Sequence, residues 1–152
     1  MYIKKGERKD AIWMVDFHKL PEHVYSKKIT DVLSPLNLYN TQLVPAKVLT
    51  KNSRYDYWIF YVRNLIECMD KKKSIVEYRT DGKTISIVEK LFIDYEKLKQ
   101  IPEENRLIFH LAEFRAIHLY HEKIKNLIES VNPVGLRFFS VDEWDDTSSF
   151  KK

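Results

Sequence analysis

Glycine is scarce in this sequence, since only Gly6, Gly82 and Gly135 occur among its 152 residues. The common nucleotide-binding folds need a glycine-rich loop, because glycine lets backbone amides approach a pyrophosphate or a triphosphate closely. Three scattered glycines supply no such loop. The sequence therefore argues against these folds.

Cysteine is rarer still. Cys68 is the single cysteine, so an internal disulfide is excluded. Near the N-terminus, no apolar stretch has the length of a signal peptide or of a membrane-spanning helix. These two absences predict a protein of the reducing cytoplasm that does not associate with a membrane.

The chain also lacks a strong excess of charge of either sign. Lysine and arginine number 26 against 22 aspartates and glutamates, a formal net charge of +4. This balance permits binding to nucleic acid but does not indicate it. Aromatic residues are plentiful by contrast, at 13% of the chain, so burial can offset the entropy of folding without a metal or a disulfide.

The length and the distribution of apolar residues predict one domain. Residues 1–10 are polar and basic and are expected to be flexible, as are residues 147–152 at the other end. The single α+β domain is expected over residues 11–146. A first strand is predicted over residues 11–17.

Two amphipathic helices are predicted, over residues 26–36 and 121–131. In the first, Ile29, Val32, Leu33 and Leu36 recur at helical spacing after the N-cap candidate Ser26. Proline is unfavourable inside a helix, so the first helix is expected to end at or just before residue 35. The second repeats the pattern with apolar residues at 124, 127, 128 and 131.

The remaining pattern predicts a mostly antiparallel sheet. Residues 55–62 are aromatic or β-branched on both alternating faces, which is typical of a central strand covered on both sides. Residues 74–79 and 83–93 flank Asp81-Gly82, a pair that favours a β-hairpin. Residues 42–49 are expected to be extended, with Pro45 indicating an edge or a bulge. A helical turn is predicted over 95–100, and short strands over 106–111, 115–119 and 136–141.

A possible internal repeat appears when residues 24–46 are placed on residues 119–141. Tyr25, Lys28 and Asn37 coincide with Tyr120, Lys123 and Asn132, and the apolar helix positions also align. Identity is sparse, so either a duplication or two similar helix-to-strand units explains the pattern. Both explanations predict two helices that flank the sheet in related ways.

Candidate metal and nucleophile residues are few. His118 and His121 stand three residues apart, a spacing that places two imidazoles on one metal if both lie on one helix. Glu122 is next to His121, but a strand-to-helix boundary is expected between the two histidines, and no cysteine or third histidine is near in the sequence to complete the shell. Cys68 has apolar neighbours, which favour a protonated and inert thiol. The sequence therefore predicts no catalytic, metal or cofactor site.

Two further chemistries deserve comparison. Asp70, Glu77 and Arg79 loosely imitate the carboxylates and basic residue of a metal-dependent nuclease, although a solvated hairpin face is the favoured explanation. Aromatic residues interleaved with lysine also occur in proteins that stack single-stranded nucleic acid. Here the aromatics crowd into residues 55–62, which is more economically explained by a core. A nucleic-acid-binding module and a small metal-dependent nuclease stay as alternatives.

Three segments together carry a family resemblance: VYSKKITDVLSPLNLYNTQLVPAKV, DYWIFYVRNLIECMDKKKS and HEKIKNLIESVNPVGLRFFSVDEW. In their order and spacing the chain resembles the immunity proteins of bacterial polymorphic toxin systems, in the group typified by a myxobacterial member. The resemblance implies a single α+β domain that binds and neutralises a cognate protein toxin. It implies neither a catalytic residue nor a cofactor.

One acidic cluster is a candidate surface for such a toxin. Inhibitors of nucleases present carboxylates that pair with lysine and arginine of the enzyme, and this net basic chain concentrates its acids in one place. Trp144 is a candidate aromatic anchor within it. The alternative is an acidic, solvated tail. The predicted partner-binding residues are Asp142, Glu143, Trp144, Asp145 and Asp146.

Overall fold

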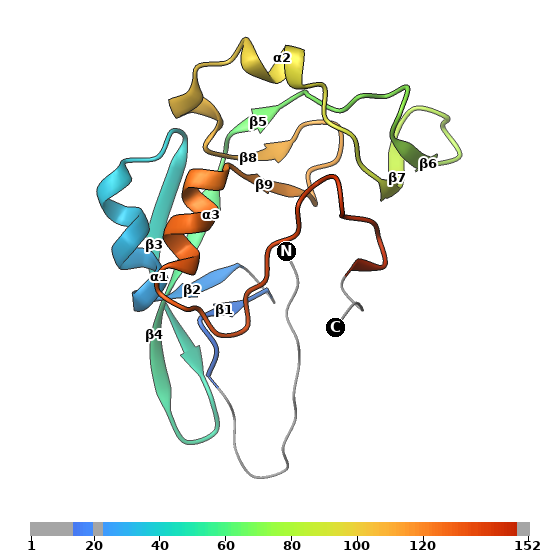
Figure 1. The fold of residues 1–152 in the computed structure, drawn as a ribbon. Helices are drawn as coiled ribbons and strands as arrows, with labels where there is room; N and C mark the ends of the chain where they lie inside the picture. Colours follow the sequence, from blue (N-terminus) through green and yellow to red (C-terminus); the bar gives the residue numbers. More distant parts are fainter. Residues whose placement is uncertain (1–13, 20–22, 149–152) are drawn as a thin grey trace.

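The computed structural model describes residues 14–19 and 23–148, and Figure 1 shows their arrangement. The α+β class with mostly antiparallel pairing is confirmed, because only β5 and β8 pair in parallel among the described strands. The predicted flexible segment 1–10 lies outside the described residues. The elements are, in chain order, β1 (Phe17–His18), β2 (Val24–Ser26), α1 (Lys27–Leu33), η1 (Ser34–Leu36), β3 (Thr41–Leu49), β4 (Arg54–Val62), β5 (Leu65–Ile66), β6 (Ile75–Tyr78), β7 (Ile85–Lys90), α2 (Tyr95–Lys99), η2 (Glu103–Arg106), β8 (Ile108–Leu111), β9 (His118–Tyr120) and α3 (Glu122–Glu129).

The largest described sheet has the strand order β1-β2-β4-β3 and is built on the long β3–β4 hairpin. The Arg63 N–H donates to the Asn40 carbonyl, and the Thr50 N–H donates to the Ser53 carbonyl. The even-numbered residues of β3 therefore bond to β4, and Pro45 turns its nitrogen to the outer edge. Proline costs no ladder hydrogen bond there, and the edge position predicted from Pro45 is confirmed.

The aromatic strand β4 lies between β2 and β3, as its composition predicted, and buried residues occur on both of its faces, although over only part of its length. Tyr57 and Phe60 are buried, whereas Tyr61 is 41% exposed and Arg54 and Asp56 face solvent. The hairpin extends beyond the helices, so much of its length has no layer packed against it. Aromatic residues at alternating positions did not distinguish the covered part of the strand from the exposed part.

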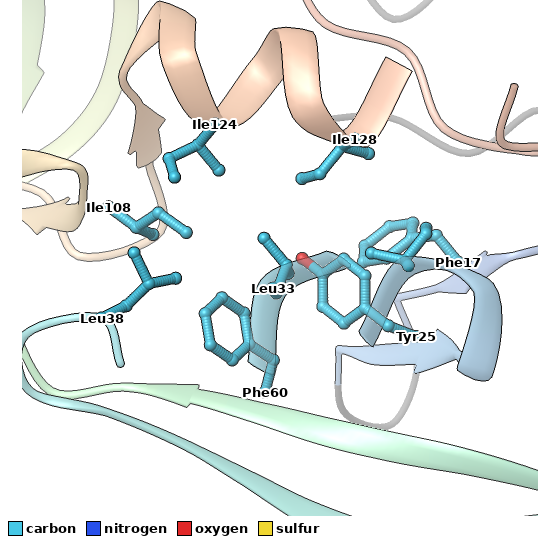
Figure 2. Packing of buried hydrophobic residues seen from close by; sticks show 9 residues of the cluster. Phe17, Tyr25, Leu33, Leu38, Phe60, Ile108, Ile124 and Ile128 are labelled. Carbon is cyan, nitrogen blue, oxygen red and sulfur yellow. The ribbon is translucent and has the colours of Figure 1, made fainter. Parts of the chain in front are cut away.

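The two amphipathic helices are present at the predicted places and pack against each other over this sheet (Figure 1). The first continues as η1, because Pro35 supplies no N–H for a longer α-helix. Ile29 and Leu33 of α1 meet Ile124 and Ile128 of α3 in the first core cluster, whose side chains converge in Figure 2. Its other buried members are Phe17, Tyr25, Leu38, Phe60 and Ile108.

A second core cluster lies beneath the smaller sheets β5-β8-β9 and β6-β7. The predicted hairpin is confirmed as β6–β7: the Asp81 carboxylate accepts the N–H groups of Lys83 and Thr84 at 2.8 Å each, and Gly82 has a φ of 65°. The predicted turn at 95–100 is α2. This cluster buries Ile66, Cys68, Met69, Val88, Leu91, Phe109 and Leu111.

Equivalent residues of the possible internal repeat have related positions in the structure. The hydroxyl groups of Tyr25 and Tyr120 lie 2.9 Å apart, and Asn37 and Asn132 both leave their helices with a left-handed backbone, at φ 45° and 48°. The predicted strand at 136–141 is wrong, however, because these residues have no strand partner. The helix and its exit turn recur while the following strand does not, so a duplication stays a hypothesis.

None of the helices in the described part of the chain is long and apolar enough to cross a membrane.

Candidate functional site

The acidic segment, defined as residues 142–146, is fixed to strand β7 through its backbone. The Lys90 ammonium donates to the carbonyl groups of Asp142 and Trp144 at 2.6 and 2.8 Å. The Asp146 N–H donates to the Glu89 carbonyl at 3.0 Å. In Figure 1 the C-terminal part of the chain, in red, runs from α3 past β9 to reach this place. The segment is therefore held in one position rather than left as a mobile tail.

Local turns complete this attachment. The N–H of Trp144 donates to the Ser140 carbonyl at 2.9 Å, which begins a turn. The Asp145 carboxylate accepts the backbone N–H and the hydroxyl of Thr147, and Ser148 is fully buried. Thr147 and Ser148 are the first two residues of the tail predicted over 147–152, and residues 149–152 lie outside the described residues.

Three carboxylates of the segment project into solvent. The side chains of Asp142, Glu143 and Asp146 are exposed, and within residues 14–19 and 23–148 none of the three forms an ion pair or a side-chain hydrogen bond. Asp145 is half-buried and serves the turn. The predicted acidic surface thus presents three of its four carboxylates outward.

Trp144, predicted as an aromatic anchor, is partly buried and packs against the second core cluster. Tyr95 at the start of α2 is the exposed aromatic residue close by, with half of its surface accessible. Burial and the neighbouring Asp142 carboxylate raise the pKa of Tyr95. Tyr95 therefore offers a second aromatic side chain for contact with a partner beside the carboxylates. It lies 47 or more positions before the segment in the chain, so no local pattern connects the two.

A pocket of about 590 Å³ adjoins the acidic segment, and Val141 and Trp144 form part of its wall. Other lining residues come from β8, β9 and the first turn of α3. Its lining is largely apolar, with charged side chains at the margin. No motif in the sequence predicted this pocket, because its walls come from segments far apart in the chain.

The two candidate metal-binding histidines occupy different elements. His118 lies in β9, whereas His121 caps α3, where its Nδ1 accepts the Lys123 N–H at 3.2 Å. No group of three histidine, cysteine, aspartate or glutamate side chains within the described ranges is arranged to hold a metal ion. The boundary predicted between the two histidines is confirmed.

The structure instead brings His118 together with His23 and His110, which we call the histidine cluster. The ring centroids of His118 lie 3.7 Å from His110 and 4.5 Å from His23. Burial lowers the pKa of His118 to about 3 and that of His23 to about 4. The rings of His118 and His23 are therefore neutral at physiological pH. They join the larger sheet to the β8–β9 sheet, a contact between residues about ninety positions apart that sequence spacing does not reveal.

The candidate nucleophile and nuclease residues have structural roles. Cys68 is fully buried, and burial raises the pKa of its thiol to about 12. The Asp70 carboxylate accepts the backbone N–H groups of Lys72 and Lys73 in a turn. Glu77 and Arg79 lie exposed on the hairpin. An inert thiol and a turn-forming carboxylate agree with the structural interpretation of these residues.

Comparison with protein families supplies the identity. A model described as "Immunity protein family (Imm11)" matches residues 6–101, which are 96 of the 152 residues. The chain belongs to this immunity protein family. The resemblance drawn from the sequence is confirmed, and the Imm11 match runs from before β1 to the end of α2. The acidic segment and the histidines of β8 and β9 lie beyond the part that matches Imm11. No curated protein sequence matches the chain.

Proposed function

We propose that this protein binds and neutralises a cognate bacterial toxin in the cytoplasm by protein–protein contact, without a catalytic step of its own. Membership of the immunity protein family is the observation that carries the proposal. A single inhibitory domain with a rigid surface fits this role, because preorganised surfaces lose little conformational entropy when they bind.

The acidic segment is the first contact surface that we propose, through Asp142, Glu143, Trp144, Asp145 and Asp146. Its fixed backbone and three outward carboxylates support this choice. Carboxylates held in place attract a basic partner and speed its association, and they pair with lysine and arginine at the interface. A toxin that binds an anionic substrate offers such a basic surface.

The first experiment is rescue in cells. Co-expression with the toxin encoded beside this gene is expected to restore growth, and a catalytically inactive toxin is expected to co-purify with the protein. If growth is not restored and no complex forms, the proposal is wrong.

The second experiment maps the surface by calorimetry. The triple variant Asp142→Lys, Glu143→Lys and Asp146→Lys is expected to bind the toxin at least tenfold more weakly, which is ~1.4 kcal/mol. Asp56→Lys, on the distant β3–β4 hairpin, serves as the control, because its exposed pair with Lys47 contributes little to stability. Equal affinity of the triple variant and the control would remove the acidic segment from the interface.

A further inference from the structure

The pocket beside the acidic segment has an apolar interior open to solvent. Residues from β8 and β9, from the stretch after β7 and from the C-terminal segment meet there. At about 590 Å³ it is large enough for one or two apolar side chains of a partner. Its apolar wall includes Leu91, Ile93, Phe109, Leu119, Phe138 and Val141.

The margin of this pocket is basic. Among the described residues, Lys19, Arg106, Lys125 and Glu122 line it. The Lys125 ammonium pairs with the Glu129 carboxylate at 2.8 Å, so Lys19 and Arg106 are the cations left for a ligand. His121 adds a ring N–H donor, because its Nδ1 accepts a backbone N–H and leaves the ring proton on Nε2. An anionic group at the margin meets the cations of Lys19 and Arg106, whereas a cationic group is repelled.

The pocket and the acidic segment form one continuous surface. Trp144 belongs to the segment and lines the pocket, and Tyr95 lies next to both. A partner that contacts the outward carboxylates therefore reaches the pocket without leaving this face. The face carries charge of both signs, with the carboxylates of residues 142–146 in the acidic segment and the cations of Lys19 and Arg106 in the lining of the pocket.

We propose that the pocket receives a segment of the toxin that carries an apolar side chain next to a carboxylate, while a basic part of the same toxin meets the acidic segment. This inference rests on the proposed function. The apolar side chain fills the interior, and the carboxylate pairs with Lys19, which forms no ion pair among the described residues. The two signs of charge admit the partner in one orientation only, because turning it around places like charges opposite each other.

Filling the pocket tests this proposal directly. Ala116 lines the pocket and is exposed, so Ala116→Trp places an indole at the opening without burying a polar group. We expect Ala116→Trp to weaken binding to the toxin at least tenfold in calorimetry. Val134→Trp is the matched control, because Val134 is 56% exposed and does not line the pocket.

The basic margin is tested by reversing its charge. Lys19→Glu is expected to weaken toxin binding at least tenfold, because it replaces a cation of the pocket by an anion. Lys27→Glu is the control, since Lys27 pairs with Asp31 on the surface of α1. Thermal unfolding verifies that each variant is folded. If Ala116→Trp does not fold, Lys19→Glu still tests the proposal.

A fluorescent aromatic anion, 1-anilinonaphthalene-8-sulfonate, distinguishes the occupants. We expect it to bind the native protein with one-to-one stoichiometry, to be excluded by Ala116→Trp and to be displaced by the toxin. Dye that binds in the pocket but stays bound with the toxin present identifies a small-anion site and overturns the proposal. A wild-type protein that fails to bind the toxin contradicts the proposed function instead, whereas tight binding by wild type and all pocket variants contradicts only this inference.

Discussion

The hydroxyl pair of Tyr25 and Tyr120 should contribute measurably to stability. The two oxygens lie 2.9 Å apart, and Tyr25 is only 1% exposed. Changing Tyr25 to Phe takes this hydrogen bond from Tyr120, and we expect the free energy of unfolding to fall by about 1–3 kcal/mol, because a buried polar group loses its partner. Tyr120→Phe is expected to cost a similar amount.

The double variant makes the test sharper. In the double variant both hydroxyls are absent, so neither loses the other as a hydrogen-bond partner. The free energy of unfolding of this variant should therefore fall by less than the sum of the two single losses, by about 1 kcal/mol. Tyr78→Phe is the control, because Tyr78 is half exposed on the hairpin and its change should fall within about 0.5 kcal/mol.

Urea unfolding at pH 7, followed by tryptophan fluorescence, supplies all four free energies. Strict additivity of the two single variants would refute the argument, since it means that the hydroxyls do not interact. High pH offers an independent check. Burial raises the pKa of Tyr120 to about 12 in the folded protein, so its neutral form favours folding up to the unfolded pKa of ~10, and stability should fall between about pH 10 and 12.

Two other perturbations have equally definite outcomes. Gly135→Ala should destabilise the protein by roughly 2 kcal/mol or more in urea unfolding, because Gly135 has a φ of 82° and an added Cβ would lie 2.6 Å from the Val15 Cβ. Gly82→Ala, with open space around it, should cost only about 1 kcal/mol, and equal losses would contradict the contact. The pKa of His23 is lowered to about 4 and that of His118 to about 3, so their neutral forms stabilise the fold above pH ~6.5 and this stability is lost as the pH falls from there toward 4. His118→Phe should therefore flatten the decline in urea midpoint between pH 7.5 and 4.5, and an unchanged slope would count against the histidine cluster.

Local signals in the sequence account for the parts of the fold that were predicted. Ile29 and Leu33, like Ile124 and Ile128, mark helix faces whose spacing alone indicates burial, and Asp81-Gly82 carries the geometry of its own turn. These features depend on residues within a few positions of each other.

The parts that failed depend on partners distant in the chain. Residues 136–141 have the composition of a strand, yet a strand exists only where another strand pairs with it. The histidine cluster has no local signal for the same reason. Sequence spacing places His118 near His121, while its neighbours in the fold are His23 and His110. The pocket likewise exists only after β8, β9 and the C-terminal segment have met.

The way Lys90 holds the acidic segment has a consequence for sequence variation. It bonds to the main-chain oxygens of Asp142 and Trp144, which every amino acid possesses, and not to the carboxylates. The exposed side chains at 142, 143 and 146 can therefore be exchanged while the loop keeps its shape. Substitutions at these three positions therefore change the charge and shape of the exposed surface without changing the backbone that carries it.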